Sequence, residues 1–165
     1  MEFHNAVLLL GGNQGDRLQC LKNALRQIEI LAGRVKLRST IYETAPWGNK
    51  DQDLFLNMAI SIETTLSPLD LLEVLQGIED GMGRERTVNW GPRYMDIDIL
   101  FYDDHIIDIP ELTIPHPRLQ ERNFVLVPLS AICPDFVHPV FNRRVGELLK
   151  DCRDDLIVYA YSEKL

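Results

Sequence analysis

An alternating segment in the middle of the chain places the strongest constraint on the fold. Apolar side chains recur at every second position from residue 95 to 101, in the order M-D-I-D-I-L-F, and two aspartates fill the first gaps. This period predicts a half-buried β-strand whose apolar face carries Met95, Ile97, Ile99 and Phe101. Asp96 and Asp98 then project from the opposite face with Leu100, about 6.6 Å apart along the strand.

The paired carboxylates are unfavourable in an ordinary strand. Like charges at neighbouring positions repel, and aspartate is a poor strand former, so we expect cationic groups to lie opposite them. Arg84, Arg86 and Arg93 precede the strand, around a W-G-P turn at residues 90–92. The cluster is either a set of mutual salt bridges or a metal–nucleotide site, with Mg²⁺ on the carboxylates and phosphate on the arginines. The residues alone leave both interpretations open.

The bulk composition is that of one globular domain. A chain of 165 residues, 45% hydrophobic and 25% charged, is expected to form a single domain over residues 1–165. The net charge of −8 argues against nucleic-acid or anionic-membrane binding. Three scattered cysteines (Cys20, Cys133, Cys152) and the absence of a signal-like N-terminus indicate free thiols and a cytoplasmic location.

The first hundred residues predict six secondary-structure elements. The apolar run Ala6–Leu10 predicts a buried strand followed by a turn at Gly11-Gly12. Leucines and isoleucines at helical spacing predict a helix from residue 18 to 31, and alternation predicts strands at 35–42 and 55–63. Ser67 and Pro68 are typical of a helix start, and that helix ends near Gly81, before the 95–101 strand.

This order of elements is typical of one α+β fold. Strand, helix, strand, strand, helix, strand is the split β-α-β pattern of a ferredoxin-like sheet, with its helices on one face. Asn57, Phe55, Asp96 and Asp98 are then expected on the opposite, open face. The rest of the chain adds C-terminal elements: a hairpin near residue 106, helices at 124–132 and 145–152, and a strand at 156–161.

Other polar residues have both an ordinary and a functional interpretation. Beside a cleft, Asn57 and Phe55 would offer an amide and an aromatic plate to a heterocycle, but they also fit an ordinary sheet surface. His116 stands between two prolines near Arg118 and Arg122, where it is either structural or a phosphate ligand.

Several motifs together resemble a known family, the 6-hydroxymethyl-7,8-dihydropterin pyrophosphokinases of folate synthesis. The match covers nearly the whole chain, and its most specific block is W-G-P-R-x-x-D-I-D-I-L at residues 90–100. The other carriers are L-G-G-N at 10–13, Y-E-T-A-P at 42–46, F-L-N at 55–57, G-R-x-R at 83–86 and P-H-P-R at 115–118 with Glu121, Arg122 and Phe124.

The resemblance implies an enzyme, a diphosphokinase that transfers pyrophosphate from ATP to the hydroxymethyl group of 6-hydroxymethyl-7,8-dihydropterin and releases AMP. Asp96 and Asp98 would hold two Mg²⁺ ions and, with Arg84, Arg86 and Arg93, form the catalytic set. The implied ATP contacts are Glu79, Arg84, Arg93, Ile99, His116 and Arg122, of which Ile99 would hold adenine through its backbone. The implied pterin contacts are Thr44, Ala45, Pro46, Trp47, Phe55, Asn57 and Phe124. Arg86 and Trp90 would belong to a lid that closes over the substrates.

The chain departs from the family pattern at a few positions. Gly12 replaces the usual serine, Phe55 a tyrosine, Asn89 an arginine and Pro117 a tyrosine, and the lid loop is one residue short. An RNA-binding module with the same element order is disfavoured, because its signature strand carries aromatic and basic residues where this chain has aspartates. A catalytically inactive relative stays open, and a monomer is expected.

Overall fold

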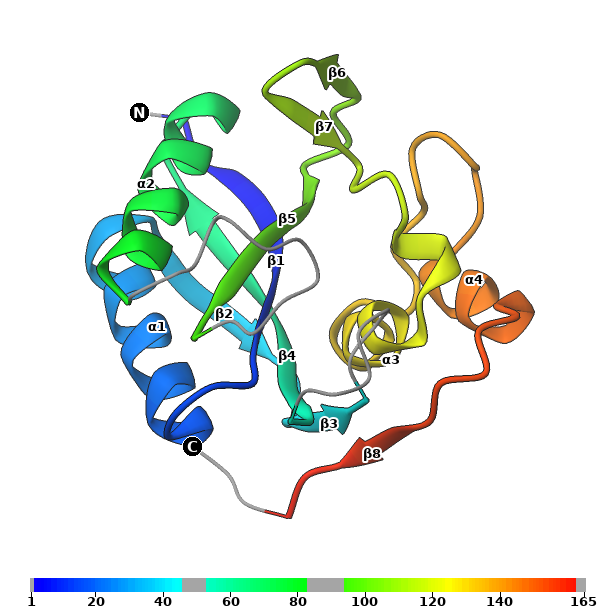
Figure 1. Ribbon diagram of the computed structural model, residues 1–165. Helices are drawn as coiled ribbons and strands as arrows, with labels where there is room; N and C mark the ends of the chain where they lie inside the picture. The colour runs from blue at the N-terminus through cyan, green and yellow to red at the C-terminus, as the bar shows by residue number, and fades with distance from the viewer. Residues whose placement is uncertain (1, 46–52, 83–93, 163–165) are drawn as a thin grey trace.

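The computed structural model describes residues 2–45, 53–82 and 94–162 (Figure 1). A central sheet has helices on both sides. The strands are β1 (His4–Gly12), β2 (Arg34–Arg38), β3 (Tyr42–Thr44), β4 (Phe55–Thr64), β5 (Asp96–Tyr102), β6 (Ile107–Ile109), β7 (Leu112–Ile114) and β8 (Val158–Ala160). The helices are α1 (Arg17–Leu31), α2 (Pro68–Gly81), α3 (Asn123–Ile132), α4 (Val145–Asp151) and a 3-10 turn, η1 (Leu119–Glu121).

The main sheet confirms the ferredoxin-like prediction. Its strand order is β5-β1-β4-β3-β8, with β2 also on β4, and its ladders are antiparallel. The predicted single strand at 35–42 is divided into β2 and β3. Between them the Ser39 amide donates to the Ala59 carbonyl (2.8 Å), and the Ser39 hydroxyl accepts from the Ala59 amide (3.0 Å). The Ser39 hydroxyl therefore replaces one backbone acceptor of the β-ladder, and the strand is interrupted there.

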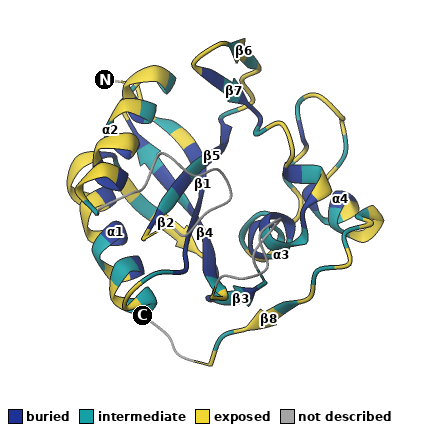
Figure 2. Ribbon diagram, in the orientation of Figure 1, coloured by how far each residue is buried: buried dark blue, intermediate teal, exposed yellow. Residues whose placement is uncertain are grey.

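Both long helices begin at residues that cap them with their own side chains. The Asp16 carboxylate accepts from the Gln19 amide (3.1 Å) at the start of α1, and Ser67 accepts from the Asp70 amide (3.2 Å) at the start of α2. The apolar faces of α1 and α2 pack on the first face of the sheet, and their outer faces are exposed (Figure 2). In α2, Leu71 lies in the core, whereas Leu69 is exposed.

The second face of the sheet packs against the C-terminal helices. Val7, Leu9 and Ala59 pack against the apolar side of α3, which includes Val125 and Leu129. The predicted open face is therefore wrong where the added C-terminal helices α3 and α4 form a second core. Of the residues expected on that open face, Asn57 is buried, and Phe55, Asp96 and Asp98 are half-buried.

A β-bulge places Phe101 on the face of the sheet opposite to the predicted one. Val7 pairs with Phe101 and Leu8 with Ile99, so Leu100 is an extra residue in β5. Ile97 and Ile99 face α1 and α2 as predicted, but Phe101 packs with Leu100 in the second core. The bulge turns the strand at the point where the chain goes on to β6 and β7.

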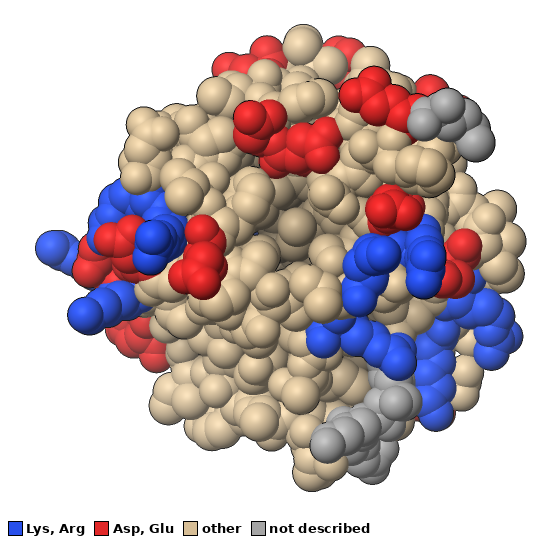
Figure 3. Space-filling view, turned by 180° about the vertical axis from the view of Figure 1, so that it is seen from behind, with Lys and Arg blue, Asp and Glu red and all other residues tan. Residues whose placement is uncertain are grey.

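The surface shows no single dominant charge on the face opposite the view of Figure 1. Lys and Arg side chains gather near the rim with Asp and Glu beside them, and the centre of this face is uncharged (Figure 3). Within the described ranges, no helix is long and apolar enough to span a membrane.

Candidate active site

Two predicted site residues, Asp96 of β5 and Asn57 of β4, fall on one row across the sheet. Gly11 of β1 pairs with Asp96 of β5 on one side and with Asn57 of β4 on the other, and Asn57 pairs with Tyr42 of β3. Paired residues share a face, and neighbouring strands lie about 4.8 Å apart. Asp96 and Asn57 are therefore roughly 10 Å apart, with the missing side chain of Gly11 between them.

The two aspartates are same-face neighbours, as predicted. Asp98 pairs with Leu9, one step along from the Gly11–Asp96 pair, and both carboxylates are half-buried. Leu9 packs in the second core with α3, so Asp98 stands at the border of that core. Two hard oxygen ligands at this spacing can bind a divalent cation or a cationic side chain.

Asn57 is held in a fixed orientation. Its side chain is only 3% exposed, and Nδ2 donates to the Thr44 hydroxyl at 2.8 Å. A Cβ built on Gly11 would lie 2.3 Å from Asn57 Oδ1. Gly11 was predicted to form a turn, but it lies inside β1, and its role is to let the Asn57 amide approach the backbone closely.

The chain around the predicted pterin residues is pinned from both sides. Phe55 pairs with Thr44 across β3 and β4 and is half-buried, as is Ala45. The Asn13 side chain, itself 3% exposed, donates to the Asp53 carbonyl at 3.0 Å. The end of the loop that leads into β4 is therefore anchored at Asp53 to the turn that follows β1.

Arg17 is an organising residue that the sequence reasoning missed. Its Nη1 donates to the Glu43 carboxylate at 2.6 Å and to the Leu54 carbonyl at 2.9 Å, and its guanidinium lies 5.7 Å from the centre of the Tyr161 ring. The sequence contained one signal for this role, because Arg17 lies in the first turn of a predicted helix, where the helix dipole disfavours a cation. A cation there needs a tertiary partner.

The Glu79 side chain links α2 to β5 by a hydrogen bond. It is 3% exposed at the end of α2, and its Oε2 accepts from the Ile97 amide at 2.7 Å. Ile97 stands between Asp96 and Asp98, so this bond fixes the backbone that carries both. Ile99, predicted as an ATP contact through its backbone, has its side chain in the first core.

His116 is held beside β5 as a neutral imidazole. Its amide donates to the carbonyl of Leu100, the bulge residue, at 3.1 Å, and its Nδ1 lies 3.4 Å from the Arg118 amide. Burial and, to a lesser extent, the charges of Arg122 and Arg118 lower its pKa from 6.5 to about 4. With Nδ1 as acceptor, Nε2 carries the proton and can donate to an anion.

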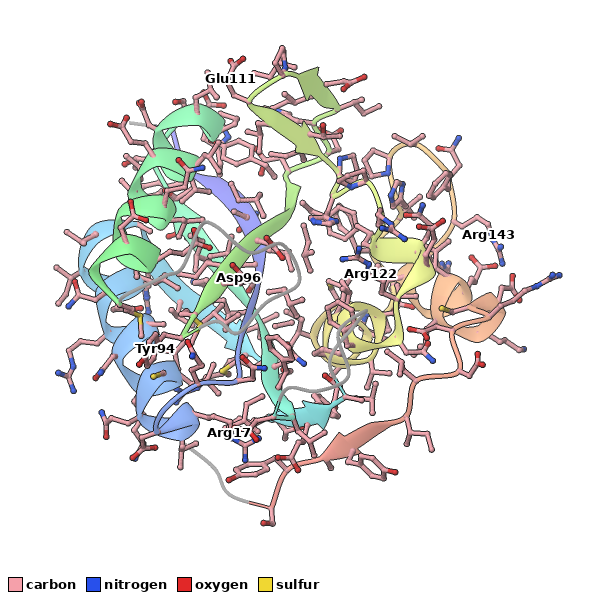
Figure 4. The ribbon with its side chains drawn as sticks, viewed as in Figure 1. Arg17, Tyr94, Asp96, Glu111, Arg122 and Arg143 are labelled. Atoms are coloured by element: carbon pink, nitrogen blue, oxygen red, sulfur yellow. The ribbon has the colours of Figure 1, made fainter. Side chains whose placement is uncertain are left out.

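Arg122 connects α3 to the aspartate strand. It is 8% exposed, its guanidinium lies 5.6 Å from the centre of the Phe124 ring, and Asp98 is among the charges that act on it. Burial lowers its pKa from the usual value, Arg118 adds to that effect, and Asp98 opposes it. In Figure 4, the Arg122 side chain lies on the side of α3 that is turned toward β5 and Asp96.

Some predicted site residues lie outside the described residues: Pro46, Trp47, Arg84, Arg86, Trp90 and Arg93. Within the described ranges, the structure brings the aspartates, Glu79, His116 and Arg122 together at β5, and Thr44, Phe55 and Asn57 at β4. In the same ranges, no group of three or more His, Cys, Asp or Glu side chains gathers as a metal site.

Comparison with known proteins identifies a family. A family model described as 7,8-dihydro-6-hydroxymethylpterin-pyrophosphokinase (HPPK) matches residues 7–134. A 2-amino-4-hydroxy-6-hydroxymethyldihydropteridine pyrophosphokinase of Bacillus subtilis is 48% identical over 129 residues, 78% of this chain and 77% of that protein. The protein of the same name from Methylorubrum extorquens is 47% identical over 133 residues, 80% of this chain and 84% of that one.

Longer relatives match over only part of their length. The folic acid synthesis protein fol1 of Schizosaccharomyces pombe is 46% identical over 145 residues, 87% of this chain but 20% of that protein. A crystal structure of Plasmodium falciparum HPPK-DHPS with pteroate has a TM-score of 0.76 at 20% identity and covers 90% of this chain and 42% of that one. At that identity the structural match speaks for the fold alone, which agrees with the ferredoxin-like sheet described above.

Proposed function

Because the chain belongs to the 7,8-dihydro-6-hydroxymethylpterin-pyrophosphokinase family, which transfers pyrophosphate from ATP to 6-hydroxymethyl-7,8-dihydropterin in folate biosynthesis, we propose that the transfer takes place on the row of Asp96, Gly11 and Asn57. The observation that supports this most is the register. It places a carboxylate pair and a fixed amide on the same face, roughly 10 Å apart, with an empty glycine position between them. That spacing suits a polyphosphate at one end and a planar heterocycle at the other.

The donor set fits Mg²⁺. Asp96 and Asp98 offer hard oxygen ligands from one strand face. Magnesium is commonly held by one or two carboxylates, with phosphate oxygens and water completing its six ligands. Asp96 and Asp98 would hold the metal, which when bound would neutralise the triphosphate charge, and we propose two ions for this carboxylate pair. The number of ions is part of the proposal.

The phosphate groups of ATP would meet two donors of different kinds. Neutral His116 offers Nε2–H without adding charge, and Arg122 offers a fixed cation in a mostly buried setting. Charge-assisted bonds from arginine to phosphate are among the stronger hydrogen bonds in proteins. Arg84 and Arg93 are proposed to add to this set, and Arg86 and Trp90 to close over it, on sequence resemblance alone.

The adenine would lie along the outer edge of β5. The Ile97 amide points out of this edge toward Glu79, and backbone groups alternate along an antiparallel strand. The amide and carbonyl of Ile99 therefore point the same way, from the edge strand of the sheet. This supports the predicted contact through the Ile99 backbone, and gives Glu79 the role of holding that edge in place.

The pterin would occupy the other end of the row. The Asn57 amide offers hydrogen bonds to a polar ring edge while Thr44 fixes its orientation. Phe55 and Phe124 are proposed to stack on the ring faces, which suits the flat, offset contacts that aromatic groups prefer. Ala45, Pro46 and Trp47 would complete the wall.

The reaction needs no protein nucleophile. The hydroxymethyl oxygen attacks the β-phosphorus, the bond from that phosphorus to the oxygen shared with the α-phosphate breaks, and AMP leaves with the electron pair. The hydroxyl proton passes to solvent. The protein contributes by alignment of the two substrates and by fixed positive groups around the transferred phosphates.

Further parts of the proposal concern the whole molecule. We propose that the chain acts as a monomer, as a single domain over residues 1–165, and in the cytoplasm, as its sequence predicts.

The test is a direct assay with ATP, Mg²⁺ and the reduced hydroxymethylpterin. We expect one AMP per pterin diphosphate, and no AMP when either Mg²⁺ or the pterin is omitted. Release of ADP or free phosphate instead would reject pyrophosphate transfer. Absence of turnover with retained binding of both substrates would indicate the inactive relative.

A further inference from the structure

The C-terminal segment between α4 and β8 clamps the first residue of α3. Asp154 Oδ2 accepts from the Asn123 amide at 2.9 Å, and Asn123 Nδ2 donates to the Asp154 carbonyl at 2.7 Å. The other carboxylate oxygen, Oδ1, accepts from the Leu156 amide at 3.0 Å and so stiffens the segment itself. Figure 1 shows this segment running past α3 toward β8.

The clamp replaces a cap that α3 does not carry itself. The first amides of a helix have no partner within the helix, and the residue that precedes α3, Arg122, makes no capping bond with its side chain. A carboxylate at this end also interacts favourably with the helix dipole. The position of the start of α3 therefore depends on a residue some thirty positions later in the chain.

The clamped residue lies between two proposed substrate contacts. Arg122 precedes Asn123 and Phe124 follows it, and the two side chains lie against each other. Asp154 also contributes favourably to the charged state of the mostly buried Arg122 guanidinium. A shift of the Asn123 amide would therefore displace both neighbours and weaken the field around Arg122.

The same arrangement occurs at the other half of the site. Glu79 binds the Ile97 amide, and Ile97 lies between Asp96 and Asp98. In both places a carboxylate from another element holds the backbone between two functional side chains. An ordinary helix cap would account for stability at α3, but not for this repeated placement.

We propose that Asp154 is a positioning residue for substrate binding, which fixes the start of α3 so that Arg122 and Phe124 reach the phosphates and the pterin. The proposal rests on the function proposed above. Asp154 itself does not touch substrate. Its effect passes through the Asn123 backbone.

The experiment measures dissociation constants for the pterin, by its own fluorescence, and for a non-hydrolysable ATP analogue with Mg²⁺. In Asp154→Ala we expect both constants to rise about tenfold, since one or two hydrogen bonds that order the site are lost. The control is Asp155→Ala, because Asp155 is the adjacent carboxylate and is exposed. It should leave both constants within twofold.

A second control separates positioning from stability. Thr64 is 1% exposed at the far end of β4, where its hydroxyl bonds the Ala32 carbonyl at 2.6 Å. Thr64→Val should lower the melting temperature by a similar amount and leave both dissociation constants unchanged. If Asp154→Ala behaves like Thr64→Val, with lower stability and unchanged binding, the positioning role is overturned.

Two further variants separate this proposal from the function it rests on. If Arg122→Ala and Phe124→Ala leave both constants unchanged, the proposed site at α3 is rejected and the role of Asp154 with it. If they weaken binding but Asp154→Ala does not, only the positioning role fails. Should Asp154→Ala not fold, Asp154→Asn keeps one acceptor, and a rise of about threefold is expected. Unchanged binding in that variant overturns the proposal.

Discussion

Substitution of Gly11 by alanine tests whether the row across the sheet is the site. The added methyl group would lie 2.3 Å from Asn57 Oδ1, far inside van der Waals contact, and 3.4 Å from Asn57 Cγ. The next nearest atom, the Leu56 carbonyl oxygen, is at an acceptable 3.5 Å. The strand backbone can therefore remain, and the Asn57 amide has to rotate away, which breaks its 2.8 Å bond to Thr44.

The expected loss of pterin affinity follows from the rotated amide. The broken bond to Thr44 lowers stability in the free and bound states alike, whereas an amide turned away from the pterin leaves a polar group of the bound ring unsatisfied, at a cost of about 1–3 kcal/mol. At about 1.4 kcal/mol per factor of ten, pterin affinity should fall roughly 10- to 100-fold. No atom of β5 is among the nearest neighbours of the added methyl group, so ATP affinity should change less than twofold.

The assay is a fluorescence titration with the pterin, beside calorimetry with the ATP analogue. Gly77→Ala is the control, because Gly77 lies inside α2 with no atom within 4 Å of an added Cβ. It should stabilise the helix by about 0.5–1 kcal/mol and leave binding unchanged. In an Asn57→Ala background, Gly11→Ala should add almost nothing, since both act through one side chain. Fully additive losses would refute the argument.

The remaining predictions concern the β5 end of the site. Asp98→Asn should lower turnover on the order of 100-fold or more through lost charge at the phosphates, measured as AMP release; a near-normal rate in excess Mg²⁺ would contradict this. Glu79→Leu should destabilise the fold by about 1–3 kcal/mol by leaving the Ile97 amide buried without its acceptor, whereas Glu79→Gln should recover most of that loss in urea unfolding; equal losses would argue against the bond. The pKa of His116, about 4 in the folded state against 6.5, means that the unfolded chain takes up a proton first as pH falls. Its contribution to stability is thus complete above pH 6.5 and lost between 6.5 and 4, by up to about 3 kcal/mol. Urea titrations across this range should show a smaller slope in His116→Asn than in the wild type, while His138, whose pKa burial also lowers, contributes equally to both; identical slopes would reject the assignment.

Local patterns were sufficient to predict most elements of the fold. Alternation placed β4 and β5, and capping residues placed the start of α2, because these signals depend only on neighbours in sequence. The Asp96 and Asp98 pair was predicted for the same reason. The element order then predicted the sheet topology, since few arrangements bury both helices on one face.

The failures arise where distant residues meet. The face of Phe101 was wrong because a bulge depends on the register with β1, which alternation within β5 does not contain. The packing of α3 on the second face was missed because it involves residues far from the sheet in sequence. Gly11 was interpreted as a turn because its partner, Asn57, is known only once the strands are paired.

Hydrogen bonds from other elements hold the backbone at three places in the proposed site. Glu79 holds the amide between the two aspartates, the Leu100 carbonyl holds the amide of His116, and Asp154 holds the amide of Asn123. A side chain is only as well placed as its own backbone, and a bound amide cannot move without loss of a hydrogen bond. Each of these hydrogen bonds joins two separate elements. A substitution far from the substrates is therefore expected to weaken substrate binding when it breaks one of them.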